Sequence, residues 1–101
     1  MEIEKNLQLT LLFDFYGELL TQRQQQIFKS YLYNDSSLGE IAEELDISRQ
    51  AVLDCLKKAE KQLSDYESKL GMLKKFNQTK QILKDNNSEL AKRIMQVWEG
   101  N

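Results

Sequence analysis

Polar and basic side chains that could contact a nucleic acid are concentrated between residues 48 and 61. In the major groove, arginine pairs with guanine and glutamine with adenine, while lysine meets phosphates. Arg49 and Gln50 are suited to base contacts if they open a helix that enters the groove. The candidate nucleic-acid contacts in this stretch are Ser48, Arg49, Gln50, Lys57, Lys58 and Lys61.

Two side chains in the same stretch oppose that interpretation. Asp54 would be repelled by a phosphate backbone, and Leu53 offers no hydrogen bond. Residues 36–47 carry four acidic side chains and no basic one, where phosphates would run. The alternative is a packing unit whose polar face is merely solvated, because a fold does not dictate a function.

A second basic stretch covers residues 69–84, which hold five lysines and no acidic side chain. Phe76 lies among these lysines, and the stretch could meet the phosphates of DNA or RNA. A solvated basic helix face explains it equally well. The additional candidate contacts are Lys69, Lys74 and Lys75.

The composition excludes several kinds of chemistry. The chain has no histidine and one cysteine, so imidazole acid–base catalysis, common zinc sites and an internal disulfide are not available. Cys55 falls on an apolar helix side, where a small buried thiol is expected. Glu43 and Glu44 point in different directions on a helix and suggest no acid and base pair. We expect no catalytic residue, no metal site and no cofactor.

The candidate contacts need a helix-turn-helix to position them, and residues 37–56 have its pattern. Ser37 and Glu40 form a capping box for a first short helix, and Ser48 caps a second. Asp46 in the turn tolerates a left-handed conformation. The inward apolar positions are Leu38, Ile41, Ala42, Leu45, Val52, Cys55 and Leu56.

The other elements are also predicted to be helical, because the chain lacks proline and is rich in strong helix formers. Apolar spacing predicts helices over residues 6–20, 22–33 and 89–98, the second opened by a capping box of Thr21 and Gln24. Gly17 weakens the end of the first helix. Asn86, Asn87 and Ser88 interrupt the pattern before the last helix, whose apolar face is predicted to hold Leu90, Ile94, Val97 and Trp98.

The second motif helix is predicted to be long, because nothing breaks the pattern before Gly71. Its apolar residues alternate steps of four and three, as in a short coiled coil: Val52, Leu56, Ala59, Leu63, Tyr66, Leu70 and Leu73. Two explanations of this seam are open: it forms the interface of a homodimer, or it packs on the chain's own first helix.

For the chain as a whole, we predict an all-α helical bundle of about five helices. It consists of a helix-turn-helix domain over 1–64 and a helical extension over 65–101, which is part of the same domain or a dimerisation element.

Charge and hydropathy limit the location and the mode of binding. The N-terminus carries Glu2 and Glu4 and no long apolar run, so we expect no membrane span and a cytoplasmic protein. A net charge of −2 argues against coating nucleic acid by bulk electrostatics.

Two family resemblances add to these predictions. The stretch from Leu20 to Leu63, with LTQRQ, SLGEIAEEL and ISRQAV, resembles region 4 of bacterial sigma factors. Over nearly the whole chain, LFDFYGELLTQRQQ, SLGEIAEELDISRQAVLD and YESKLGMLKKF resemble the YlxM-like helix-turn-helix proteins.

The YlxM-like resemblance implies a role in the signal recognition particle pathway, beside that particle's GTPase and RNA. The leading hypothesis is a non-enzymatic nucleic-acid-binding or accessory protein of that pathway. A sequence-specific DNA-binding transcriptional regulator and a protein-interaction adaptor that binds no nucleic acid are the alternatives.

Overall fold

The computed structural model describes residues 7–84 and 88–99, and all regular structure in these ranges is helical. The all-α prediction is therefore confirmed. The chain divides into an N-terminal unit, Met1–Leu70, and a C-terminal unit, Gly71–Asn101. The domain boundary predicted after residue 64 lies within a helix that continues to Leu70. The division of the chain into a helix-turn-helix domain and a helical extension stays a prediction.

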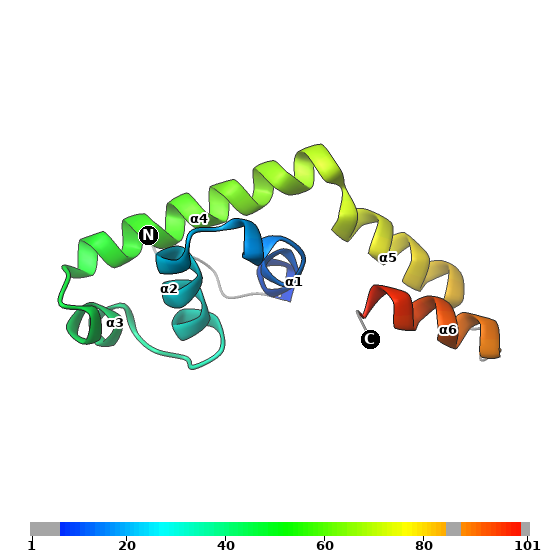
Figure 1. Ribbon diagram of the computed structural model, residues 1–101, viewed down its shortest axis with the longest axis horizontal. Coiled ribbons are helices and arrows are strands. Elements are labelled where there is room, and N and C mark those ends of the chain that lie inside the picture. Colours follow the sequence, from blue (N-terminus) through cyan, green and yellow to red (C-terminus); the bar gives the residue numbers. More distant parts are fainter. Residues whose placement is uncertain (1–6, 85–87, 100–101) are drawn as a thin grey trace. The chain divides into compact units, whose positions relative to one another are not determined.

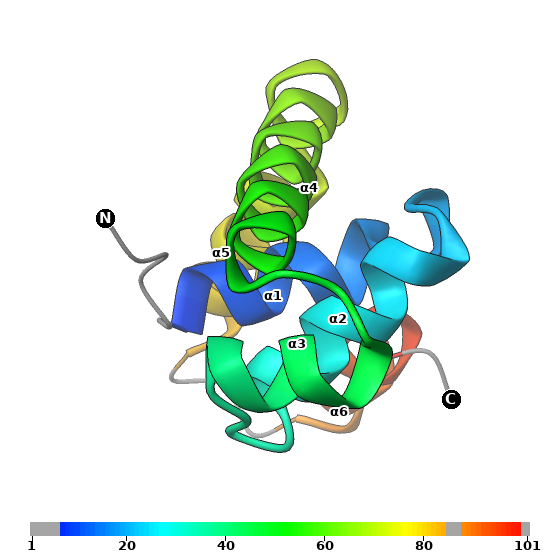
Figure 2. The ribbon, with the colours of Figure 1, turned by 90° about the vertical axis from the view of Figure 1, so that its left-hand side faces the viewer.

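The N-terminal unit is built along one long helix, α4 (Arg49–Leu70). Helices α1 (Leu7–Tyr16), α2 (Gln22–Leu32) and α3 (Leu38–Leu45) all contact it and gather on one side of it (Figures 1 and 2). The side chains of α4 that fill this contact are fully buried: Val52, Leu56, Ala59 and Leu63. These are the first four positions of the predicted seam, so this part of the seam packs within the chain.

The first predicted helix is shorter than expected. It ends at Tyr16, and a 3-10 turn, η1 (Gly17–Leu19), follows. A Cβ at Gly17 would lie 3.0 Å from the ring of Phe13, which stacks on Phe28 at 5.1 Å between ring centroids. Glycine thus permits the close approach of the aromatic core, and Asn6, the predicted start, lies outside the described residues.

The buried face of α1 also differs from the simplest sequence pattern. Its buried residues are Leu9, Leu12, Phe13 and Tyr16, whereas Leu7 is 74% exposed. A helix that is apolar on most sides does not itself specify which side faces the core. The elements that pack against α1 determine which of its sides is buried.

The capping predictions for α2 and α3 are confirmed. Thr21 accepts a hydrogen bond from the Gln24 backbone at 3.1 Å, and Gln24 Oε1 accepts one from the Thr21 backbone at 2.9 Å. Ser37 and Glu40 make the same reciprocal pair at 3.0 and 2.8 Å. The Ser37 bonds also hold the pKa of Glu40 below its usual value.

The C-terminal unit is a hairpin of α5 (Met72–Leu83) and α6 (Glu89–Trp98), so the described residues hold six α-helices instead of about five. The extra break occurs at Gly71, which is left-handed at φ 63° and ψ 27° and ends α4. Ser88 caps α6 by accepting from the Ala91 backbone at 3.1 Å. Asn86 and Asn87, predicted to break the helix, lie outside the described residues.

The hairpin is closed by aromatic contacts. Phe76 and Trp98 meet edge-on at 5.8 Å between ring centroids, and Lys80 Nζ lies 5.3 Å from the Phe76 centroid. The apolar face predicted for α6 is only partly correct: Ala91 is its buried residue, while Leu90 and Val97 are exposed.

Candidate nucleic-acid interface

The turn between α3 and α4 has the geometry that the sequence predicts. Asp46 is left-handed at φ 56° and ψ 46°, and its backbone N–H donates to the carbonyls of Ala42 and Glu43 in α3. The Ile47 N–H donates to the Ala42 carbonyl at 3.0 Å. Ser48 Oγ then accepts from the Ala51 N–H at 3.0 Å and caps α4. Ser48 therefore has a structural role at the helix start, in addition to its place among the candidate contacts.

The first turns of α4 separate an inward face from an outward face. The inward face is the buried stripe that starts at Val52. On the outward side, Arg49, Gln50, Asp54, Lys57, Lys58 and Lys61 are all exposed, and Leu53 is half-buried. Gln50, Lys57 and Lys61 share one side of the helix, because they are separated by seven and four residues. The structure thus brings Gln50, Lys57 and Lys61 together on one accessible side of α4, whereas Arg49 and Lys58, nine residues apart, lie on opposite sides of the helix.

Asp54 lies within that surface and is bound to a candidate contact. Gln50 Nε2 donates to Asp54 Oδ1 at 2.8 Å, one helical turn away. The carboxylate therefore occupies one N–H of the amide that would read a base, and it adds a negative charge beside Lys57 and Lys58. Further along, Lys61 Nζ lies 3.4 Å from Asp65 Oδ2.

Arg49 lines a surface groove of about 470 Å³ at the start of α3. Its other lining residues include Tyr31, Asp35 and Ser37. The groove places a guanidinium and a carboxylate at one edge of the helix-turn-helix. Arg49 thus lies at the junction of α2, α3 and α4, and the lysines lie further along α4.

The three additional lysines divide between the two units. Lys69 is exposed in the last turn of α4, and Lys74 and Lys75 are exposed on α5. Their role as contacts stays a prediction.

Two hydrogen bonds that position α4 were not predicted. Gln24 Nε2 donates to Gln62 Oε1 at 2.6 Å, and Tyr16 Oη donates to Glu67 Oε1 at 2.7 Å. Among the described residues of the unit, Gln24 is the buried polar one, at 6% exposure. The capping box identified Gln24 as a helix-start residue, but no sequence signal linked it to a residue 38 positions later.

Cys55 is half-buried, so the buried thiol that the sequence predicts is only partly observed. Burial raises the pKa of its thiol above the usual value, with an opposing contribution from the nearby charges of Arg23 and Lys58. A thiol with a raised pKa stays protonated and is a weak nucleophile at neutral pH.

Metal-binding and membrane-spanning features do not occur in residues 7–84 and 88–99. No three acidic, histidine or cysteine side chains in these ranges are grouped to hold a metal ion. Over the same ranges, no helix combines the length and the apolarity that crossing a membrane requires.

Together, the capped turn, the buried inner face and the exposed polar face of α4 define a helix-turn-helix protein. The chain belongs to the UPF0122 family, described as "Putative helix-turn-helix protein, YlxM / p13 like", whose model matches residues 3–98. The description of this family agrees with the helix-turn-helix that α3 and α4 form.

Relatives support that membership. A UPF0122 protein of Listeria welshimeri is 48% identical over 90 residues, which cover 89% of this chain and 82% of the relative. A UPF0122 protein of Caldanaerobacter subterraneus is 60% identical over 70 residues, which cover 69% of this chain and 60% of the relative. The predicted resemblance to YlxM-like proteins is confirmed.

Proposed function

We propose that this chain is a non-enzymatic, cytoplasmic nucleic-acid-binding protein whose contact surface is the outward face of α4. One observation carries the proposal: the first turns of α4 bury Val52 and Leu56 while exposing Arg49, Gln50 and Lys57. In helix-turn-helix proteins, this part of the second helix enters the major groove. Family membership supports the same class of function.

The charges around that face do not distinguish DNA from RNA. Asp54 and the exposed Glu43 and Glu44 of α3 disfavour tight contact with either backbone, because each phosphate carries a negative charge in both. The RNA of the signal recognition particle, together with its GTPase, is the target that we carry forward from the YlxM-like resemblance. A regulator that reads promoter DNA in the manner of sigma region 4 is the second candidate, favoured by the exposed pair Arg49 and Gln50.

We also propose that the protein is a homodimer. Paired helix-turn-helix units bind two half-sites and so double the contact surface. The first half of the coiled-coil seam is filled within the chain, so the dimer cannot use that half of the surface that the sequence indicated.

Titration of the full chain separates these functions. Random-sequence duplex DNA and the RNA of the signal recognition particle are each titrated at low and at high salt. Phosphate contact requires affinity to fall as salt rises. If neither nucleic acid binds at low salt, the proposal is wrong and the adaptor function is favoured.

A pair of lysine variants locates the surface. Lys57→Ala should weaken binding to every sequence and reduce the salt dependence by about one unit of slope. Lys29→Ala removes an exposed lysine from α2 and is the matched control. Equal effects of the two changes would show that the outward face of α4 is not the contact surface.

A further inference from the structure

The C-terminal hairpin has very little core of its own. Of its described residues, Leu73 and Ala91 are the buried apolar ones. Its helices have 12 and 10 residues, and isolated helices shorter than about 12 to 15 residues are marginal in water. The hairpin therefore needs a further surface to cover it.

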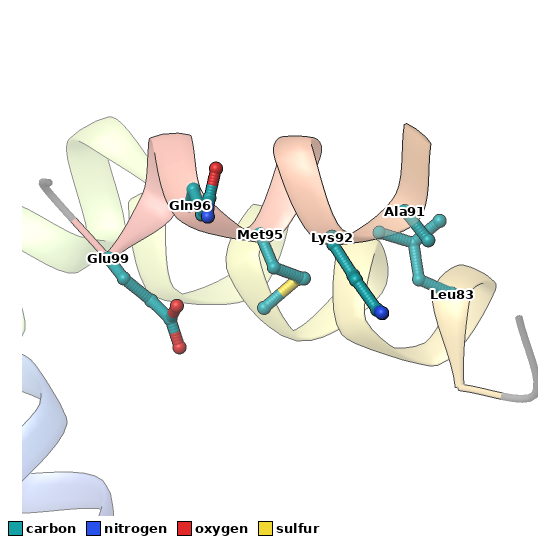
Figure 3. Close-up of a pocket in the computed structure, with 6 residues that line it drawn as sticks. All are labelled: Leu83, Ala91, Lys92, Met95, Gln96 and Glu99. Carbon is teal, nitrogen blue, oxygen red and sulfur yellow. The ribbon is translucent and has the colours of Figure 1, made fainter. Parts of the chain in front are cut away.

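The packing of α5 against α6 also leaves a groove on the surface of the hairpin. A groove of about 360 Å³ lies at the end of α5 and along α6, with Leu83, Ala91 and Met95 as its apolar lining (Figure 3). Lys92, Gln96 and Glu99 form its polar edge. The side of α6 that faces α5 is thus the one bearing Ala91 and Met95.

A different side of α6 carries the strongest apolar pattern. Leu90, Ile94 and Val97 follow steps of four and three, with Arg93 between them, and we call these four residues the α6 stripe. Leu90 is 66% and Val97 79% exposed, and Ile94 is half-buried. The sequence pattern predicts that this stripe is covered, but within the hairpin itself most of it is exposed.

Helix α1 has an exposed stripe of the same spacing and the opposite charge. Leu7, Leu11 and Asp14 follow steps of four and three, and we call them the α1 stripe. Leu7 and Asp14 are exposed and Leu11 is half-buried, and the exposed Glu18 follows in η1. An apolar helix face with an acidic end complements an apolar helix face that carries arginine.

The net charges of the two whole units are also opposite in sign, with the acidic excess in the unit that holds the α1 stripe. Residues 1–70 contain eight basic and thirteen acidic side chains, a net charge of −5. Residues 71–101 contain six basic and three acidic ones, a net charge of +3. Pairing two hairpins would bring like charges together, whereas pairing a hairpin with an N-terminal unit brings opposite charges together.

We propose that two copies of this chain form a two-fold dimer in which the α6 stripe of each copy packs on the α1 stripe of its partner. Two-fold symmetry makes the contact reciprocal, so both apolar stripes of both copies are covered. The inference rests on the proposed homodimer and is independent of nucleic-acid binding.

Sedimentation equilibrium of the full chain tests the dimer itself. The expected mass is twice the 11.9 kDa of one chain, and high salt should weaken association by screening the opposite charges. A monomer at the highest concentration reached would overturn both the homodimer and its surface, and would leave nucleic-acid binding to be judged by its own titration.

Single substitutions then test the surface. Val97→Glu and Leu7→Glu should each shift the protein to monomer, raising the dimer dissociation constant at least tenfold. The matched control is Ile82→Glu, because Ile82 is equally exposed at 79% but lies on α5, outside both stripes. The control should leave the dissociation constant unchanged.

A folding control and the pattern of dissociation among the three variants complete the test. Cooperative urea unfolding of the N-terminal unit should survive all three exposed substitutions, which excludes misfolding as the cause of dissociation. A dimer that persists in Val97→Glu, or that is lost equally in Ile82→Glu, overturns the α6 stripe. A dimer lost in Val97→Glu but kept in Leu7→Glu overturns α1 as the partner surface.

Discussion

The side chain of Gln24 makes two hydrogen bonds at once, one that caps α2 and one to Gln62 of α4 at 2.6 Å. Its Oε1 closes the capping box with the Thr21 backbone, and its Nε2 holds the long helix in place. A residue with a local role at a helix start thus also fixes the helix that bears the candidate interface. The orientation of α4 therefore depends on the cap of α2.

Gln24→Ala should lower the free energy of unfolding by about 2 kcal/mol, because it removes a cap partner and a buried hydrogen bond together. Urea denaturation measures the change. Gln26→Ala, at an exposed position of the same helix, is the control and should stay within about 0.5 kcal/mol of the parent. A Gln24 variant as stable as this control would contradict the double role.

Alkaline pH should selectively weaken the contact between Tyr33 and Asp14. Tyr33 Oη donates to Asp14 Oδ1 at 2.8 Å, and burial, followed by the bond to Asp14 and its charge, raises the pKa of Tyr33 from 10.0 to about 12. The fold favours the protonated phenol, so this contribution to stability is complete below pH 10 and is lost as the pH rises through about 12.

The comparison is between the parent and Tyr33→Phe across that pH range. The stability difference between the two proteins, measured by thermal unfolding, should shrink as pH rises from 10 to 12. A difference that stays constant would mean that the phenol is not held protonated by the fold.

Substitution by alanine should lower the stability of the protein at Gly71 and raise it at Gly39. Gly71 has a φ of 63°, which alanine adopts only at a cost of about 1 kcal/mol, although no atom obstructs a Cβ there. Gly39 lies in helix α3, where a Cβ would make an ordinary contact with Ser37 Oγ at 3.9 Å, so alanine should stabilise by about 0.5 to 1 kcal/mol.

Calorimetry of Gly71→Ala and Gly39→Ala measures whether each substitution lowers or raises the stability of the protein. Stabilisation by Gly71→Ala would show that the chain prefers a continuous helix through residue 71. Such a result would contradict the break between α4 and α5.

Asp54→Asn should raise the affinity for nucleic acid several-fold if the outward face of α4 meets phosphates. The change removes a negative charge beside Lys57 and Lys58 and weakens the bond that holds Gln50. Fluorescence anisotropy with duplex DNA or RNA at low salt measures it. Glu89→Gln removes the same charge from exposed α6 and serves as the control; an equal gain there would indicate bulk charge alone.

Local features of the sequence were sufficient to predict the helix-turn-helix. The capping boxes of α2 and α3, the left-handed Asp46 and the cap at Ser48 each depend on residues within a few positions of one another. Because such interactions are decided by short-range geometry, they can be predicted from a single sequence. The lack of histidine likewise limits the available chemistry through composition alone.

The tertiary structure decided which of several apolar faces became the core. On α1, Leu9 and Leu12 are buried while Leu7 is not; on α6, Ala91 is buried while Leu90 and Val97 are not. The seam of α4 likewise packs within the chain as far as Leu63. Periodicity identifies an apolar face but not the surface that covers it, because burial depends on neighbours that are distant in the sequence.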